Sequence, residues 1–202
     1  MKRHFGTLAA CVAVALAIPV GVSAHARHRN AMKAPPLSDT QFMREAAVGG
    51  MAEVDLGQIG VQRAQNPEVK QFAQRMVDDH SKANEELKQV AAKRSVTLPG
   101  DVDAKHKATI DRLSKLSGAA FDKAYMRDMV GDHVHDVSLF ERQSASGKDA
   151  DLKSWIDQTL PTLKEHEQMA KDVAGKVGAG SGGGVHGAAQ RERKAQLSAT
   201  TH

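Results

Sequence analysis

The spacing of its apolar residues limits what this chain can fold into more than any other feature. Between residues 38 and 174, apolar side chains return every three or four positions through four long stretches, which is the spacing of one face of an α-helix. Four such helices bury their apolar faces by packing together, so the spacing predicts an all-α four-helix bundle. The four stripes contain Phe42, Ala46, Gly49, Glu53, Leu56 and Gly60; Phe72, Met76, His80, Ala83, Leu87 and Val90; Phe121, Tyr125, Met129, His133, Val137 and Phe140; and Ile156, Leu163, His166, Met169 and Val173.

Capping residues and helix breakers predict where these helices begin and end. Ser38-Asp39-Thr40-Gln41 has the pattern of a capping box at the start of a first helix that runs to Gln65. Asn66-Pro67 starts the second helix, which runs to about Arg94.

The rest of this region is predicted in the same way. An extra short helix is expected over residues 105–116, before Ser117-Gly118 opens the third long helix. Asp149 is the predicted cap of the fourth helix. Pro161 lies inside that helix and predicts a kink one turn before His166.

Composition supports an aromatic-poor helical domain. Aromatic residues make up 3% of the chain, which argues against a β-sandwich, a base-stacking nucleic-acid module and a large aromatic pocket. The single cysteine excludes a disulfide framework and a cysteine-based zinc site.

Both ends of the chain are predicted to lie outside the bundle domain, which spans residues 38–174. Residues 1–26 have the basic start, the apolar run and the small residues of a signal peptide, which predicts export to the periplasm or outer envelope. Cys11 lies in this segment, so the mature protein would contain no cysteine. Residues 27–37 are a basic linker, and residues 175–202 are a Gly-rich basic tail whose composition predicts disorder.

Charge is divided unevenly between these segments. The whole chain carries +4, but the bundle domain has 19 basic against 23 acidic residues, a balance of −4. A nucleic-acid partner is therefore not expected, because its binding needs a basic face on the folded domain. The tail carries +3 and predicts at most a weak contact with anionic envelope surfaces.

Three histidines lie on the core stripes of three different helices. A single inward histidine is usually a hydrogen-bonded core residue, but His80, His133 and His166 are harder to explain that way because each buried ring needs a partner. His135 points off its stripe and is expected to be solvated. The other six, including His106, are not expected to contribute to a site.

Glu53 lies on the inward stripe of the first helix, so each long helix offers one metal-binding side chain. The predicted metal ligands are Glu53, His80, His133 and His166. Imidazole and carboxylate together suit one zinc, iron, manganese or copper ion. Two alternatives stay open: Glu53 could be an edge carboxylate that reaches solvent, and the histidines could form a metal-free cluster.

A short sequence occurs twice, as Met76-Val77-Asp78-Asp79-His80 and as Met129-Val130-Gly131-Asp132-His133. The repeat is interpreted as a duplicated hairpin that places two equivalent ligands across a pseudo-two-fold axis. The two aspartates point about 100° away from the histidines, so they are expected to lie outside the set of direct ligands. Methionine sulfur beside imidazole would favour copper, although methionine more often fills a core.

Three further blocks accompany this repeated segment: Ala52-Glu53-Val54-Asp55-Leu56-Gly57, Phe121-Asp122 and Leu160-Pro161-Thr162-Leu163. In this combination the sequence resembles the secreted bacterial proteins of the family called domain of unknown function (DUF) 4142. The resemblance covers nearly the whole of residues 38–173. It implies a ferritin-like fold and an exported protein without an agreed activity. The recurrent polar positions of the family fall on the same four residues that the stripes select.

The sequence departs from di-iron bundles, which use Glu-x-x-His on two helices. Val77, Val130 and Leu163 stand three positions before the three inward histidines, so too few carboxylates are available. No nucleophile constellation, phosphate-binding loop or catalytic carboxylate pair is present either, so an enzyme is less expected than a binding protein and could only be metal-dependent, through the same metal site. Two functions remain: an exported metal-binding bundle, or a non-catalytic envelope or stress-related protein with a metal-free histidine cluster.

Overall fold

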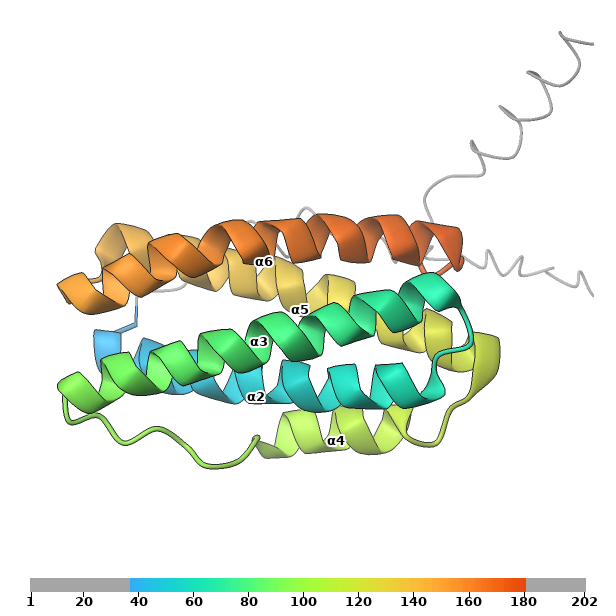
Figure 1. The fold of residues 1–202 in the computed structure, drawn as a ribbon, viewed down its shortest axis with the longest axis horizontal. Coiled ribbons are helices and arrows are strands. Elements are labelled where there is room, and N and C mark those ends of the chain that lie inside the picture. The colour runs from blue at the N-terminus through green and yellow to red at the C-terminus, as the bar shows by residue number, and fades with distance from the viewer. Residues whose placement is uncertain (1–36, 181–202) are drawn as a thin grey trace, which may run out of the picture.

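The computed structural model describes residues 37–180, so the predicted signal peptide, most of the linker and most of the tail lie outside the described residues. Its elements are α2 (Asp39–Arg63), α3 (Pro67–Lys93), α4 (Ala104–Leu113), α5 (Gly118–Ser146) and α6 (Ala150–Lys176), with no strand in the described part. The protein is a ferritin-like four-helix bundle with α4 as an extra short helix (Figure 1). No helix in this range is long and apolar enough to cross a membrane.

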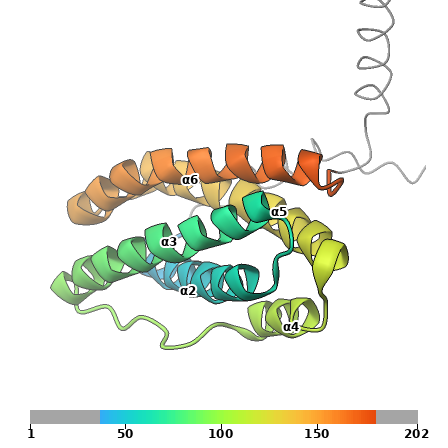
Figure 2. The same cartoon turned by 45° about the vertical axis from the view of Figure 1, so that its right-hand side comes forward.

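The four long helices form two hairpins joined by a crossover. α2 packs with α3 and α5 packs with α6, while the connection through α4 returns the chain to the end of the bundle where α3 began (Figures 1 and 2). As a result α3 and α5 run in the same direction (Figure 1). α3 is the second helix of its hairpin and α5 is the first of its own. A duplicated hairpin therefore does not explain the Met-Val-x-Asp-His repeat. Duplication would make α3 equivalent to α6, whereas the repeat relates α3 to α5.

The predicted caps form as expected. Ser38 and Gln41 make both hydrogen bonds of the capping box, and the Asn66 side chain accepts from the N–H groups of Glu68 and Val69. Asp149 accepts from the N–H of Leu152 at the start of α6.

At its other end α6 continues past the predicted domain boundary at residue 174. The helix ends at Lys176, and Ala179 packs into the core. The described residues thus continue the domain a short way into the segment that composition assigns to the tail.

Each hairpin turn is fastened by a carboxylate from the other hairpin. Buried Asp122 accepts hydrogen bonds from the backbone N–H groups of Gln65 (3.1 Å) and Asn66 (2.9 Å) between α2 and α3. Asp39 accepts from the N–H groups of Lys148 (3.1 Å) and Asp149 (2.9 Å) between α5 and α6. Charged acceptors for otherwise unpaired turn donors fix how the hairpins meet.

Small residues bring α2 and α3 close together. A Cβ atom at Gly57 would lie 2.9 Å from the Ala73 carbonyl oxygen, and one at Gly60 would lie 2.6 Å from the Ala73 Cβ. Both distances are shorter than real Cβ contacts, so only glycine permits this helix spacing.

The core consists of two apolar clusters. The first contains residues from the start of α2, the end of α3, the end of α5 and the start of α6: Phe42, Met43, Ala46, Ala47, Leu87, Val90, Ala91, Val137, Leu139, Phe140, Leu152, Trp155, Ile156 and Leu163. The second fills the opposite end: Leu56, Val69, Phe72, Ala73, Met76, Leu113, Phe121, Tyr125, Met126, Met129, Ala170, Val173, Ala174 and Ala179. A polar layer lies between them.

Candidate metal centre

The polar layer is made of one side chain from each long helix. Glu53 of α2, His80 of α3, His133 of α5 and His166 of α6 are all buried, with exposed fractions of 3%, 5%, 0% and 1%. The helical stripes thus predicted the burial of all four correctly. Glu53 is not the solvent-reaching edge carboxylate of the alternative interpretation.

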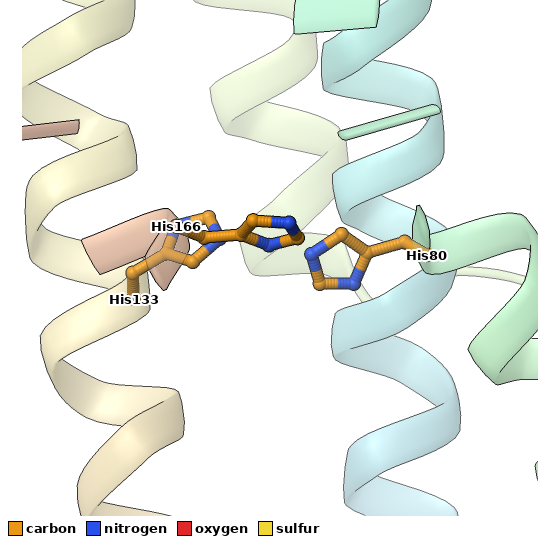
Figure 3. A group of neighbouring side chains, drawn as sticks. All are labelled: His80, His133 and His166. Carbon is orange, nitrogen blue, oxygen red and sulfur yellow. The ribbon is translucent and has the colours of Figure 1, made fainter. Parts of the chain in front are cut away.

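The three histidine rings converge on one point (Figure 3). Their ring centroids lie 5.7 Å (His80 to His133), 5.3 Å (His80 to His166) and 5.4 Å (His133 to His166) apart. One nitrogen from each ring lies within 4.8 Å of the other two. No other such group of metal-binding side chains occurs in the part of the chain that the structure describes.

Hydrogen bonds fix the orientation of two of these rings. Nδ1 of His133 lies 2.9 Å from the carbonyl oxygen of Met129, one turn earlier on α5. Nε2 of His166 lies 2.7 Å from the Asp79 carboxylate of α3. Because a carbonyl and a carboxylate can only accept, these two nitrogens carry the ring protons, and the opposite nitrogens present lone pairs.

The Asp79 carboxylate is itself held in place. The Arg75 Nε lies 3.1 Å from the same Oδ2 atom, and the Arg75 guanidinium also bonds Glu165 of α6 at 2.9 Å. Although burial opposes the shift, the hydrogen bonds from His166 and Arg75 lower the pKa of Asp79. Asp79 is therefore a charged partner behind His166, which agrees with its expected place outside the direct ligands.

The inward nitrogens of the rings have no partner. His80 Nε2, His133 Nε2 and His166 Nδ1 are buried and form no hydrogen bond with any described residue. A buried polar atom left unpaired costs about 1–3 kcal/mol. Three of them in one layer are a set of lone pairs ready to bind an electron-pair acceptor.

The surroundings keep two of these rings, His80 and His166, neutral. Burial lowers the pKa of His80 well below its usual range, and the nearby His133 and His166 rings lower it further. Burial lowers the pKa of His166 to about 4, even though its hydrogen bond with Asp79 acts in the opposite direction. Neutral imidazole is the form that coordinates metal ions, so at neutral pH no proton has to leave these two rings first.

Glu53 lies in the layer but outside the group of converging nitrogens. Its Oε1 atom is 3.9 Å from His133 Nδ1, the nitrogen that faces the Met129 carbonyl, and its Oε2 atom is buried without a partner. Burial raises the pKa of the Glu53 carboxyl well above its usual range, and Asp132 raises it further. Of the four predicted ligands, the structure brings three together and places the fourth beside them.

The neighbouring side chains have other roles. Met76 and Met129 are completely buried in the second apolar cluster, as core-filling methionines would be. The His135 side chain is 55% exposed and lies 3.7 Å from Glu45, as expected for a histidine off the stripe.

Sequence reasoning missed a pocket beside the layer. A pocket of about 540 Å³ reaches Glu53 and His80 and is also lined by Asp132, Asp136 and His106. The sequence does not predict a contribution from His106, but this residue lies on α4, hydrogen-bonded to Asp103 at 2.8 Å, and lines the pocket. The four-residue spacing of the two aspartates is the one signal that could have revealed this wall, because it places both on one face of α5.

Comparisons with known proteins place this chain in a family. Residues 23–173 match the domain of unknown function DUF4142, so the chain belongs to that family. No curated protein matches the sequence.

Solved structures share the fold. A DUF305 protein from Streptomyces coelicolor, described as secreted, aligns with a TM-score of 0.61 at 16% identity, over 72% of this chain and 95% of its own. A DUF305 fragment from Deinococcus radiodurans aligns at 0.61 and 15%, over 70% and 99%. CopM in its Cu(II)-bound form aligns at 0.60 and 18%, over 70% and 99%.

Proposed function

We propose that this DUF4142 protein is an exported metal-binding bundle in which His80, His133 and His166 hold one transition-metal ion. The observation that carries the proposal is the set of three buried imidazole nitrogens that face one another without hydrogen-bond partners. A metal ion accepts all three lone pairs at once. A water molecule has only two hydrogens to donate and would leave one nitrogen unpaired.

The outer hydrogen bonds support the same proposal. Histidines that bind metals almost always donate their other ring N–H to a carbonyl or a carboxylate, which fixes the ring and its tautomer. His133 has the Met129 carbonyl in this place and His166 has the Asp79 carboxylate. These residues would orient the ligands before the ion arrives.

The type of ligand narrows the choice of metal. Among zinc, iron, manganese and copper, a set of three neutral imidazoles suits zinc, copper and iron better than manganese, because manganese prefers carboxylate and water oxygens. The presence of Cu(II) in CopM, a protein of the same fold, adds support for copper. Copper and zinc are the ions to test first.

The direct test is metal content of the full chain, purified without a histidine tag and soaked with Cu(II) or Zn(II). We expect about one ion per chain by elemental mass spectrometry, and its loss in H80A, H133A and H166A. H135A is the matched control, because His135 lies two residues from His133 on α5 but is exposed. Circular dichroism of each variant separates loss of a ligand from loss of the fold.

Two results would decide against the site. An unloaded wild-type protein would leave the metal-free histidine cluster as the better account of the layer. Equal metal content in H133A and H135A would show that the ion binds elsewhere.

Glu53 needs a test of its own. As a fourth ligand it would have to leave its position beside His133 Nδ1 and turn toward the metal. E53Q keeps the size of the side chain and removes the carboxyl group that could ionise and bind the metal. A large drop in affinity would identify Glu53 as a ligand, whereas unchanged affinity would restrict the ligands to the three histidines.

Export is the second part of the proposal. The leader-like residues 1–26 support it, as does the secreted description of the Streptomyces coelicolor neighbour. N-terminal sequencing of protein recovered from the periplasm is expected to begin after Ala24 or Ala26. A product that still begins at Met1 would argue against a cleaved signal peptide.

A further inference from the structure

The pocket beside the polar layer extends from exposed residues to His80, the one histidine of the three that lines it. Its inner wall contains His80 and Glu53. Its outer wall includes Asp103, Lys105 and His106, which belong to α4 and the residue that caps it. The extra helix therefore forms one side of the approach to the candidate metal centre.

The charge of the pocket selects the kind of molecule that enters it. Five carboxyl groups line it against two basic side chains, an excess of three acidic groups. Burial raises the pKa of Glu53 well above its usual range and that of Asp136 to about 7, but a cation that enters the pocket favours their ionised forms. The carboxylates are Glu45, Glu53, Asp103, Asp132 and Asp136, and the basic residues are Arg44 and Lys105. Such a wall attracts cations and repels anions.

Two buried atoms at the inner end of the pocket lack partners. Oε2 of Glu53 and Nε2 of His80 are each buried without a hydrogen bond among the described residues. Both side chains line the pocket and are at least nine-tenths buried. Oε2 of Glu53, which the three-histidine site does not use, is the independent sign that the acidic wall leads to a ligand and is not simply a solvated surface.

We propose that this pocket is the access route by which a hydrated divalent cation reaches the three histidines, with Asp132, Asp136 and Glu53 as successive contacts. The proposal rests on the metal site proposed above. The three carboxylates do not converge in one group as the histidines do, so they suit transient contacts better than a second closed site. At each step a carboxylate oxygen replaces a water ligand, and imidazole nitrogens replace the carboxylates at the end.

Removing charge from the wall should slow loading and leave the final affinity unchanged. The test is stopped-flow mixing with Cu(II) at low ionic strength. The single Trp155 lines the pocket and reports the ion by quenching of its fluorescence. For D132N/D136N we expect an association rate about 10-fold slower, with a weaker salt dependence and an unchanged metal content at equilibrium.

The matched control is E85Q/D172N, which removes two carboxylates that do not line the pocket. It should load like the wild type. Equal rates in the two double variants would overturn the access route and leave the metal site standing. A wild-type protein that binds no ion would overturn both proposals, so the two failures are distinguishable.

Discussion

The segments Met76–His80 and Met129–His133 have the same pattern of residues but different surroundings. In both, the methionine is fully buried in the second apolar cluster and the histidine enters the polar layer. The aspartates differ. Asp79 bonds His166 and Arg75, whereas Asp132 lines the pocket beside α4 and has no hydrogen bond or ion pair among the described residues.

This difference shows that helical spacing and helical neighbours supply separate information. Spacing places each aspartate about 100° from its histidine in both segments. The neighbour of that face is α6 in one case, and the pocket beneath α4 in the other. One aspartate therefore orients a ligand, while the other faces the approach of the ion.

The methionines should give the largest effects and should behave alike. M76A and M129A each leave a cavity in the fully buried core, so we expect each to lower the free energy of unfolding by about 2–5 kcal/mol. Chemical denaturation measures this. M76L and M129L keep the volume and should cost less than about 1.5 kcal/mol. A loss of copper affinity in a leucine variant would instead make that sulfur a ligand.

The next effect is that of acidification, which should distinguish His166, the partner of Asp79 in the first segment, from Asp136, which lies near the second. The pKa of His166 is about 4 in the folded protein and about 6.5 in an unfolded chain, so the unfolded state binds more protons between these values. Metal-free protein should therefore lose stability as the pH falls from 6.5 to 4, by about 3 kcal/mol from His166 alone. Denaturation at several pH values, with chelator present, measures the slope.

Asp136, near the second segment, acts in the opposite direction. Burial, with a further effect of Glu53, raises its pKa to about 7, so its protonation favours the folded state as the pH falls. H166Q should flatten the acid-induced loss and D136N should steepen it. Identical slopes in the two variants would contradict the assigned roles.

The aspartates should differ in metal affinity. D79N weakens the charged partner of His166, and we expect a 10–100-fold lower affinity, the usual effect of losing such a partner. D132N should leave the equilibrium affinity unchanged. Competition with a chelator of known affinity measures both variants, and equal losses would mean that the two aspartates have equivalent roles.

Asp78 and Gly131, the third residues of the two segments, should give the smallest effects. Gly131 is exposed within α5, and an added Cβ would meet nothing within 4 Å. G131A should therefore stabilise the protein by about 0.5–1 kcal/mol. D78A, at the matching exposed position of α3, should stay within about 0.5 kcal/mol of zero. Thermal unfolding detects the difference, and a destabilised G131A would indicate a requirement for glycine there.

Much of the fold could be predicted because its causes are local. The apolar period gave the helices, and the side chains of Ser38, Asn66 and Asp149 cap their own helices within three residues. The same period predicted the burial of Glu53, His80, His133 and His166, since a stripe is a property of one helix. The place of Asp79 behind His166 could not be predicted, because those residues are 87 positions apart.

The sequence by itself determined which residues face inward, because 3.6 residues per turn fix the angle of each side chain around its own helix. Only the tertiary structure decided which of them meet. The crossover through α4 made α3 and α5 run in the same direction, so His80 and His133 reach the same level with His166 between two apolar clusters. It also left Glu53 beside the converging nitrogens and opened the acidic pocket, since the distance between side chains on different helices depends on how the helices pack.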